Sequence, residues 1–161
     1  MPTRLAFDRD CLMILQRNLY AVQPDEGCAL LLGESVYPAT SGIWLIVRLI
    51  WPCCNVWPAP KSSRQVSRQA RFALDPREQI QAQRWARRKG LRVLGSAHSH
   101  SNKSLVPSET DRCLASAGSL MVILDDRGAV AGWIWPGPPL RWGNTLPILL
   151  GHWMIQTQTL N

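Results

Sequence analysis

The stretch "GSAHSHSNKSLVPSETDR", residues 95–112, contains two of the three histidines of the 161-residue chain. Side chains alternate between the two faces of a β-strand, so His98 and His100, at the end of an apolar strand, point to the same side. Asp111 lies one turn into the helix predicted next, and the short connection returns its carboxylate to the same place. Two imidazoles and a carboxylate can hold one zinc ion and leave its fourth position open for water, as catalytic zinc sites do.

The same letters also have a purely structural interpretation. In "SETD", Ser108 can cap the helix while the acid at the third helical position returns a bond to the backbone, which is a variant of the capping box. A His-x-His pair alone is a weak signal. Either feature by itself favours the structural interpretation, but both together at this spacing favour a metal site. The Ser108 hydroxyl can then serve both the helix and the chemistry.

Hydrolysis at such a metal site requires a group that accepts a proton from water. Four carboxylates lie near predicted strand ends: Asp25, Glu26, Glu34 and Glu109. Glu26 directly precedes the apolar run "GCALLLG", so a neighbouring strand can carry it into the site. The alternative is a solvated acid ahead of a buried strand, which is the commoner role of such a residue.

Composition limits the class of protein. A hydrophobic content of 46% with 18% charged residues is typical of a globular domain. Five cysteines without a C-x-x-C pair argue against a disulfide framework and a zinc ribbon. The sequence contains neither a secretory signal nor an apolar run of membrane-spanning length, and we therefore expect a cytoplasmic protein. The net charge of +7 predicts an acidic partner, either nucleic acid or protein.

Strand and helix patterns alternate along the chain and predict an α/β or α+β fold with a mixed β-sheet flanked by helices. We expect one domain over residues 1–136, with a tail over residues 137–161 packed on it and His152 as a packing residue of that tail. The predicted helices span residues 8–23 with Asp8 as the N-cap, 76–89, and 108–118 closed by Gly118. The predicted strands span residues 27–34, 42–51, 71–74, 91–98, 119–126 and 129–136.

Three segments resemble the JAMM, or MPN-plus, zinc metalloprotease family. The spacing His-Ser-His, seven residues, Ser108, two residues, Asp111 matches its signature. "PDEGCALLLGE" is similar to its glutamate segment, and residues 71–100 look like its bacterial members. The resemblance covers about residues 11–135 and implies a fold similar to that of cytidine deaminases. Two positions depart from the family pattern without removing a ligand: Ser101 replaces a proline, and Ala29 replaces a glycine.

The resemblance implies a peptidase or isopeptidase that cuts after the C-terminal Gly-Gly of a ubiquitin-like or sulfur-carrier protein. His98, His100 and Asp111 would hold one zinc ion with a bound water. Glu26 would take the proton of the attacking water and deliver it to the leaving amine. Ser108 would donate a hydrogen bond to the oxyanion. The basic loop with Lys61, Arg64, Arg68 and Arg71 could contact an acidic carrier, although such runs are usually only solvated surface.

Three other functions compete with this one. A nucleic-acid-binding or DNA-repair-associated protein of the same fold would use the basic run "RWARRKG", residues 84–90. Cations at the C-terminal end of a helix are also favoured by the helix dipole. Because the dipole already explains this run, nucleic acid is disfavoured as the partner. The H-x-E and P-C-x-x-C pattern of base deaminases is absent from this sequence. An inactive scaffold of the same fold usually lacks metal ligands, whereas every ligand position is filled in this sequence. Cys28 and Cys113 are expected to be buried inert thiols rather than extra ligands.

Overall fold

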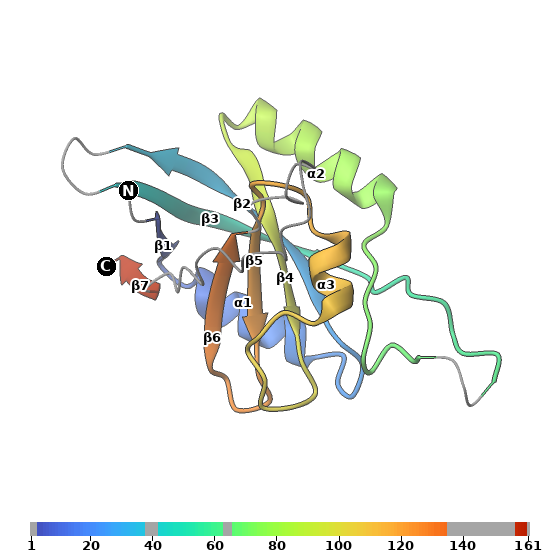
Figure 1. Ribbon diagram of the computed structural model, residues 1–161. Coiled ribbons are helices and arrows are strands. Elements are labelled where there is room, and N and C mark those ends of the chain that lie inside the picture. Colours follow the sequence, from blue (N-terminus) through green and yellow to red (C-terminus); the bar gives the residue numbers. More distant parts are fainter. Residues whose placement is uncertain (1–2, 38–41, 63–65, 135–156, 161) are drawn as a thin grey trace, which may run out of the picture.

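A computed structural model describes residues 3–37, 42–62, 66–134 and 157–160. Within these ranges seven strands form one mixed sheet in the order β6-β5-β4-β2-β3-β1-β7, and three helices pack on it (Figure 1). The predicted mixed sheet flanked by helices is therefore confirmed. The strands are β1 (Thr3–Asp8), β2 (Cys28–Val36), β3 (Ile43–Cys53), β4 (Arg92–Ser99), β5 (Leu120–Leu124), β6 (Val130–Ile134) and β7 (Thr157–Leu160), and the helices are α1 (Cys11–Tyr20), α2 (Pro76–Arg88) and α3 (Glu109–Leu114).

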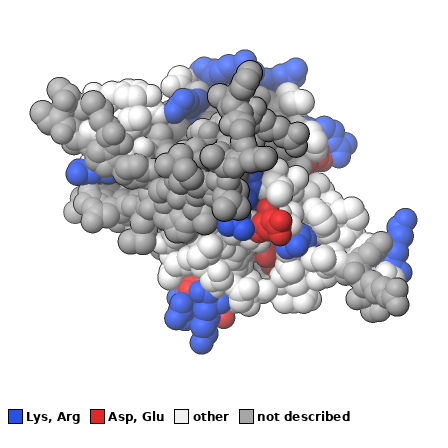
Figure 2. Space-filling view, viewed as in Figure 1, with Lys and Arg blue, Asp and Glu red and all other residues white. Residues whose placement is uncertain are grey.

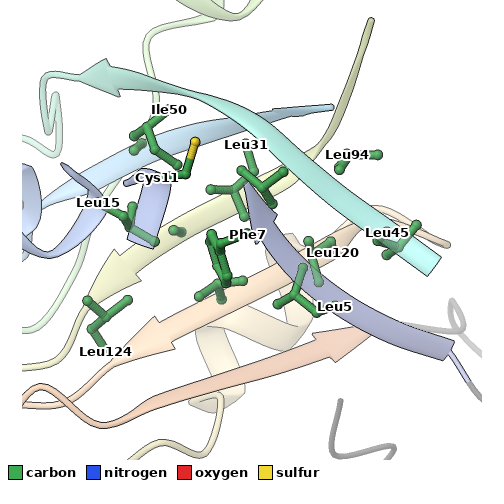
Figure 3. Packing of buried hydrophobic residues seen from close by; sticks show 14 of the residues in the cluster. Leu5, Phe7, Cys11, Leu15, Leu31, Leu45, Ile50, Leu94, Leu120 and Leu124 are labelled. Atoms are coloured by element: carbon green, nitrogen blue, oxygen red, sulfur yellow. The ribbon is translucent and has the colours of Figure 1, made fainter. Parts of the chain in front are cut away.

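Alternation along β2 divides the apolar side chains between two layers. Leu31 joins the core cluster that includes Leu15 of α1, and Figure 3 shows these side chains among the strands of the sheet. Leu30 on the other face packs in a second cluster with Ala82 and Ala86 of α2. The helices α1 and α2 thus cover opposite faces of the sheet, because neighbouring strand residues point to opposite sides.

Strand β4 lies inside the sheet and carries the first histidine. It pairs antiparallel with β2, where Cys28 faces His98, and parallel with β5, where His98 faces Ile123. A Cβ atom at Gly95 would lie 1.8 Å from the carbonyl oxygen of Leu120, so only glycine permits the close approach of β4 and β5 at this point. Two neighbouring strands therefore fix the backbone of His98.

Several predicted boundaries were wrong for identifiable reasons. Asp8 does not cap α1: it ends β1 and forms an ion pair of 3.1 Å with Arg48. Helix α3 ends at Leu114 rather than at Gly118, because Ala115 already has an extended backbone. The strand predicted at residues 71–74 is reduced to an isolated bridge between Asn55 and Leu74. Helix α2 begins as predicted, after Asp75, whose side chain accepts the N–H of Arg77.

Most of the predicted tail lies outside the described residues. Strand β7 pairs in parallel with β1 at the edge of the sheet. The predicted boundary at residues 136–137 and the packing role of His152 both fall in residues 135–156 or depend on them, so they stay predictions. Among the described residues, no helix is both long and apolar enough to span a membrane.

Candidate metal centre

Three predicted ligands converge on one point. His98 lies near the end of β4, His100 follows that strand directly, and Asp111 stands in the first turn of α3. The Nε2 atoms of His98 and His100 are 3.0 Å apart, and each lies 3.6 Å from Oδ2 of Asp111. All three residues are buried. The sequence prediction that these side chains gather in one place is therefore confirmed.

The dimensions of this cluster suit a small tetrahedral cation. Zinc–ligand bonds of about 2.0–2.2 Å in a tetrahedron place neighbouring ligand atoms about 3.3–3.5 Å apart. The three observed separations of 3.0, 3.6 and 3.6 Å bracket that value. Two imidazole nitrogens and one carboxylate oxygen are also a donor set that zinc accepts, with one position left for water. The residues present therefore fit a catalytic type of metal site.

Neighbouring groups hold each ligand in place. Nδ1 of His100 lies 2.7 Å from the carbonyl oxygen of Ser104, so Nδ1 carries a proton and donates it, which leaves Nε2 free to bind a cation. Oδ2 of Asp111 accepts the Ser108 N–H at 2.7 Å. Nδ1 of His98 is buried and has no hydrogen-bond partner among the described residues. Its ring is held instead by stacking on Phe72, with ring centroids 4.4 Å apart.

The capping box and the metal cluster turn out to use the same residues. The Ser108 hydroxyl oxygen accepts the Asp111 N–H at 3.1 Å, while the Asp111 carboxylate accepts the Ser108 N–H. The structural interpretation of "SETD" is therefore correct, and it does not compete with the functional one. Because the hydroxyl acts as an acceptor in the cap, its own proton remains available to a substrate oxygen.

Glu26 lies next to the cluster because of strand register. Cys28 pairs with His98, and the next residues continue the pairing: Ser99 donates its N–H to the Gly27 carbonyl at 3.0 Å. The Gly27 N–H in turn donates to the Ser99 hydroxyl at 2.9 Å. The same register places Glu26 beside His100, on the face that carries the ligands. Glu26 is buried, so the alternative of a solvated acid is wrong.

Burial changes the proton affinity of these groups. Desolvation raises the pKa of Glu26 to about 7, although the charge of His100 opposes this. Desolvation also lowers the pKa of His98. Desolvation lowers the pKa of His100, but Asp111, the Ser104 carbonyl and Glu26 together outweigh it, so this pKa is raised. Burial raises the pKa of Asp111, but the two imidazoles and Ser108 together outweigh it, so this pKa is lowered. A cation bound here would displace a proton from the imidazoles, so we expect metal affinity to fall in acid.

The raised pKa of Glu26 predicts a cost to the stability of the metal-free protein. The folded state favours the protonated carboxyl of Glu26 over the charged one. The stability that depends on this proton is complete below pH 4.5, the ordinary pKa of the group, and it is lost as the pH rises through about 7. In excess chelator at pH 8, Glu26→Gln should therefore raise the free energy of unfolding by about 2 kcal/mol in urea denaturation. At pH 4.5 and below, the gap from wild type should close. An equal gap at both pH values would contradict this linkage, and Asp25→Asn provides the control.

A cavity of about 410 Å³ adjoins the cluster on the α2 side of the sheet. Its lining includes Leu30, Phe72, Gln83, Ser96, Asp111 and Met121. Asp111 thus belongs both to the ligand cluster and to the cavity wall. The wall of this cavity mixes apolar and polar side chains, and it lies beside the ligand cluster.

Other expected residues lie apart from the ligand atoms. Cys28 is a buried thiol whose pKa burial raises to about 12, so it stays protonated, as expected of an inert thiol. Cys113 is exposed, and the prediction that it is buried was wrong. Ser101 donates its hydroxyl to the Gln69 carbonyl at 2.9 Å, and Ala29 packs in the core on the opposite face. The two departures from the family pattern therefore leave the ligands in place.

Sequence reasoning missed two residues of the site. Ser99 enters the sequence pattern only as the residue between the two histidines, yet its hydroxyl accepts the Gly27 N–H. Phe72 was placed in a short strand, yet it stacks on His98 from a loop 26 residues away in sequence. The position of Ser99 between two ligands was an available signal. No local pattern marks Phe72, because its contact depends on the path of the chain.

Several proteins of known structure are similar to this chain. Among solved structures, the chain is similar to a protein from Desulfitobacterium hafniense (22% identity, TM-score 0.64, covering 81% of this chain and 83% of that one). It is also similar to a protein from Salinibacter ruber (27% identity, TM-score 0.53, covering 83% of this chain and 81% of that one). A JAB1/MPN domain protein from Archaeoglobus fulgidus aligns over 98% of this chain and 97% of its own at 16% identity and a TM-score of 0.49. No curated protein matches the sequence.

The fold and the cluster define a mixed α/β domain with a candidate metal site of the JAMM type. The model for prokaryotic homologs of the JAB domain matches residues 11–136, and the chain belongs to this family. The match includes every ligand residue and Glu26. The resemblance inferred from the sequence is therefore confirmed, and the site is that of a candidate metallohydrolase.

Proposed function

We propose that this protein is a zinc-dependent peptidase or isopeptidase that hydrolyses the bond after the C-terminal Gly-Gly of a ubiquitin-like or sulfur-carrier protein. One observation carries the proposal: the Nε2 atoms of His98 and His100 and Oδ2 of Asp111 converge, with buried Glu26 beside them. A buried acid whose pKa is raised next to an open metal site is suited to general acid–base catalysis.

Each residue of the site would have its own role in hydrolysis. His98, His100 and Asp111 would hold zinc, which supplies the Lewis acidity that activates water and polarises a carbonyl. Glu26 would accept a proton from water as the oxygen adds to the carbonyl carbon. It would then return that proton to the amine as the carbon–nitrogen bond breaks. The Ser108 hydroxyl, already an acceptor in the helix cap, would donate to the carbonyl oxygen as negative charge develops there.

The charge of the surface supports an acidic protein partner. Figure 2 shows Lys and Arg side chains gathered along the top edge, where Figure 1 places α2. Arg84, Arg87, Arg88 and Lys89 are exposed at the C-terminal end of that helix. In the predicted basic loop, Arg64 lies outside the described residues, and half-buried Arg68 hydrogen-bonds to the Trp57 carbonyl. An acidic carrier would be steered toward α2, and we expect KM to rise with ionic strength.

The test combines metal analysis with a cleavage assay. The purified protein should carry about one zinc per chain and should cut a carrier–Gly-Gly–peptide fusion. It should spare the same fusion with Val-Val in place of Gly-Gly, because the proposed specificity requires glycine at both positions before the scissile bond. A zinc-loaded protein that leaves both fusions intact but binds duplex DNA with a steep salt dependence would overturn the proposal in favour of nucleic-acid binding.

A further inference from the structure

Asn55 stands at the base of a long excursion of the chain between β3 and α2, and its described parts, residues 54–62 and 66–75, are called the arm. Figure 1 shows the arm extending away from the sheet before it returns to α2. The Asn55 amide oxygen accepts the N–H of Trp57 at 3.0 Å and that of Ala73 at 3.2 Å. One side chain therefore ties the outgoing and the returning parts of the arm together.

The amide nitrogen of Asn55 links the arm to the candidate site. It donates to the carbonyl oxygen of Glu26 at 2.9 Å and to that of Arg71 at 2.9 Å. A carboxamide offers two donors and two acceptor lone pairs, so all four hydrogen-bonding positions of Asn55 are in use. Such a fully satisfied side chain is held in a single orientation, and it can fix its partners in turn.

Glu26 depends on the arm for its backbone hydrogen bonds. It precedes β2, so the strand ladder does not hold it: its N–H donates to the Arg68 carbonyl at 2.8 Å, and its C=O accepts from Asn55. Both partners belong to the arm. The next residue, Gly27, is held from the other side by Ser99, which lies between the two histidines. The peptide group after Glu26 is thus held between Asn55 of the arm and Ser99 at the end of β4.

The arm also contacts the ligands directly. Phe72, which stacks on His98, precedes Ala73, whose N–H is bonded to Asn55 and whose carbonyl accepts the Val56 N–H at 3.0 Å. The same amide side chain therefore fixes the backbone beside Phe72 and the backbone of Glu26.

We propose that Asn55 is a positioning residue, which holds the Glu26 backbone at its place against the metal centre. The proposal depends on the function proposed above for its catalytic consequence, because Asn55 itself contacts neither a ligand atom nor a substrate. Positional errors of about 1 Å near a reacting centre can lower rates about a hundredfold. Removing the two donated hydrogen bonds should therefore affect the rate of the chemical step and leave metal binding intact.

Asn55→Asp tests this role with a side chain of the same shape. It keeps an oxygen for the N–H groups of Trp57 and Ala73, but sets a second oxygen against the Glu26 and Arg71 carbonyls, which it cannot bond. We expect kcat to fall about 10- to 100-fold, with KM and the zinc content unchanged. Amide hydrogen exchange at Glu26 and Gly27 should also become faster in the zinc-loaded protein.

Two further variants separate positioning from a general loosening of the arm. Trp57→Phe removes the indole donor to the Val66 carbonyl, a bond within the arm at 3.2 Å, and should leave kcat within about twofold. Asn55→Ser, which is smaller and neutral, replaces the Asp variant if that variant does not fold. Wild-type kcat and wild-type exchange at Glu26 in Asn55→Asp would overturn the proposal.

The exchange measurement also distinguishes this proposal from the proposed function. If the wild-type protein cuts no Gly-Gly fusion, the proposed function fails. Exchange at the Glu26 and Gly27 amides still decides whether Asn55 fixes this backbone. Faster exchange in Asn55→Asp than in Trp57→Phe supports this role of Asn55, and equal exchange in the two variants overturns it.

Discussion

Glu26→Gln should keep one zinc per chain and lower kcat for cleavage of a Gly-Gly fusion by about 10²- to 10⁴-fold, the range that general acid–base catalysis contributes. Glutamine has nearly the shape of glutamate. The hydrogen bonds of the residue 26 backbone, donated to the Arg68 carbonyl and accepted from Asn55, do not involve the changed atoms. The amide cannot accept a proton from water at neutral pH. Steady-state cleavage kinetics and zinc analysis of the same preparation measure the two effects separately.

Asp25→Asn is the matched control for that experiment. Asp25 is the preceding residue, and the same change of one charge there should leave kcat within about twofold, since surface substitutions usually have small effects. Wild-type cleavage by Glu26→Gln would show that another group takes the proton. Loss of zinc from Glu26→Gln would instead place Glu26 among the groups that hold the metal.

The ligand set could be predicted because its geometry is local. His98 and His100 are two residues apart on a strand, and Asp111 follows in the first turn of the next helix. Strand alternation and the short connection leave little freedom for these side chains. Glu26 is 72 residues from His98, and its place depends on the register of β2 with β4. No local pattern contains that register, so the position of Glu26 before an apolar strand made it one of four candidate bases, and the resemblance to a family then implied its role.

Parts of the fold escaped prediction because distant segments decide them. Strand β1 pairs in parallel with β3, about forty residues further along the chain, and with β7, where Asp8 faces Leu160. Asp8 therefore ends a strand and does not cap a helix. Asn55 stands among cysteines and prolines in a segment that reads as an ordinary loop. Its importance comes from hydrogen bonds to Glu26 and Ala73, and only the folded path of the arm brings those groups to it.

Asp111→Asn should greatly weaken zinc binding and, at limiting zinc, bring cleavage to background. The carboxylate supplies the negative charge of a site whose other ligands are neutral imidazoles, and its Oδ2 lies 3.6 Å from both Nε2 atoms. Loss of a residue that only hydrogen-bonds to a metal ligand typically lowers the metal affinity about 10- to 100-fold. Loss of a ligand itself should have a larger effect, so we expect the Kd for zinc to rise more than about a hundredfold. Competition with a fluorescent chelator measures this change.

Glu109→Gln separates the ligand role of Asp111 from the charge of the helix N-terminus. Both acids stand in the first turn of α3, where negative charge favours the helix, but Glu109 is exposed and lies outside the cluster. Asparagine at position 111 keeps an oxygen that can accept the Ser108 N–H, so the capping box is largely preserved. Equal zinc affinity in the two variants would mean that the metal, if bound, is held elsewhere. A loss confined to Asp111→Asn would tie the affinity to the point where the two imidazoles and the Asp111 carboxylate meet.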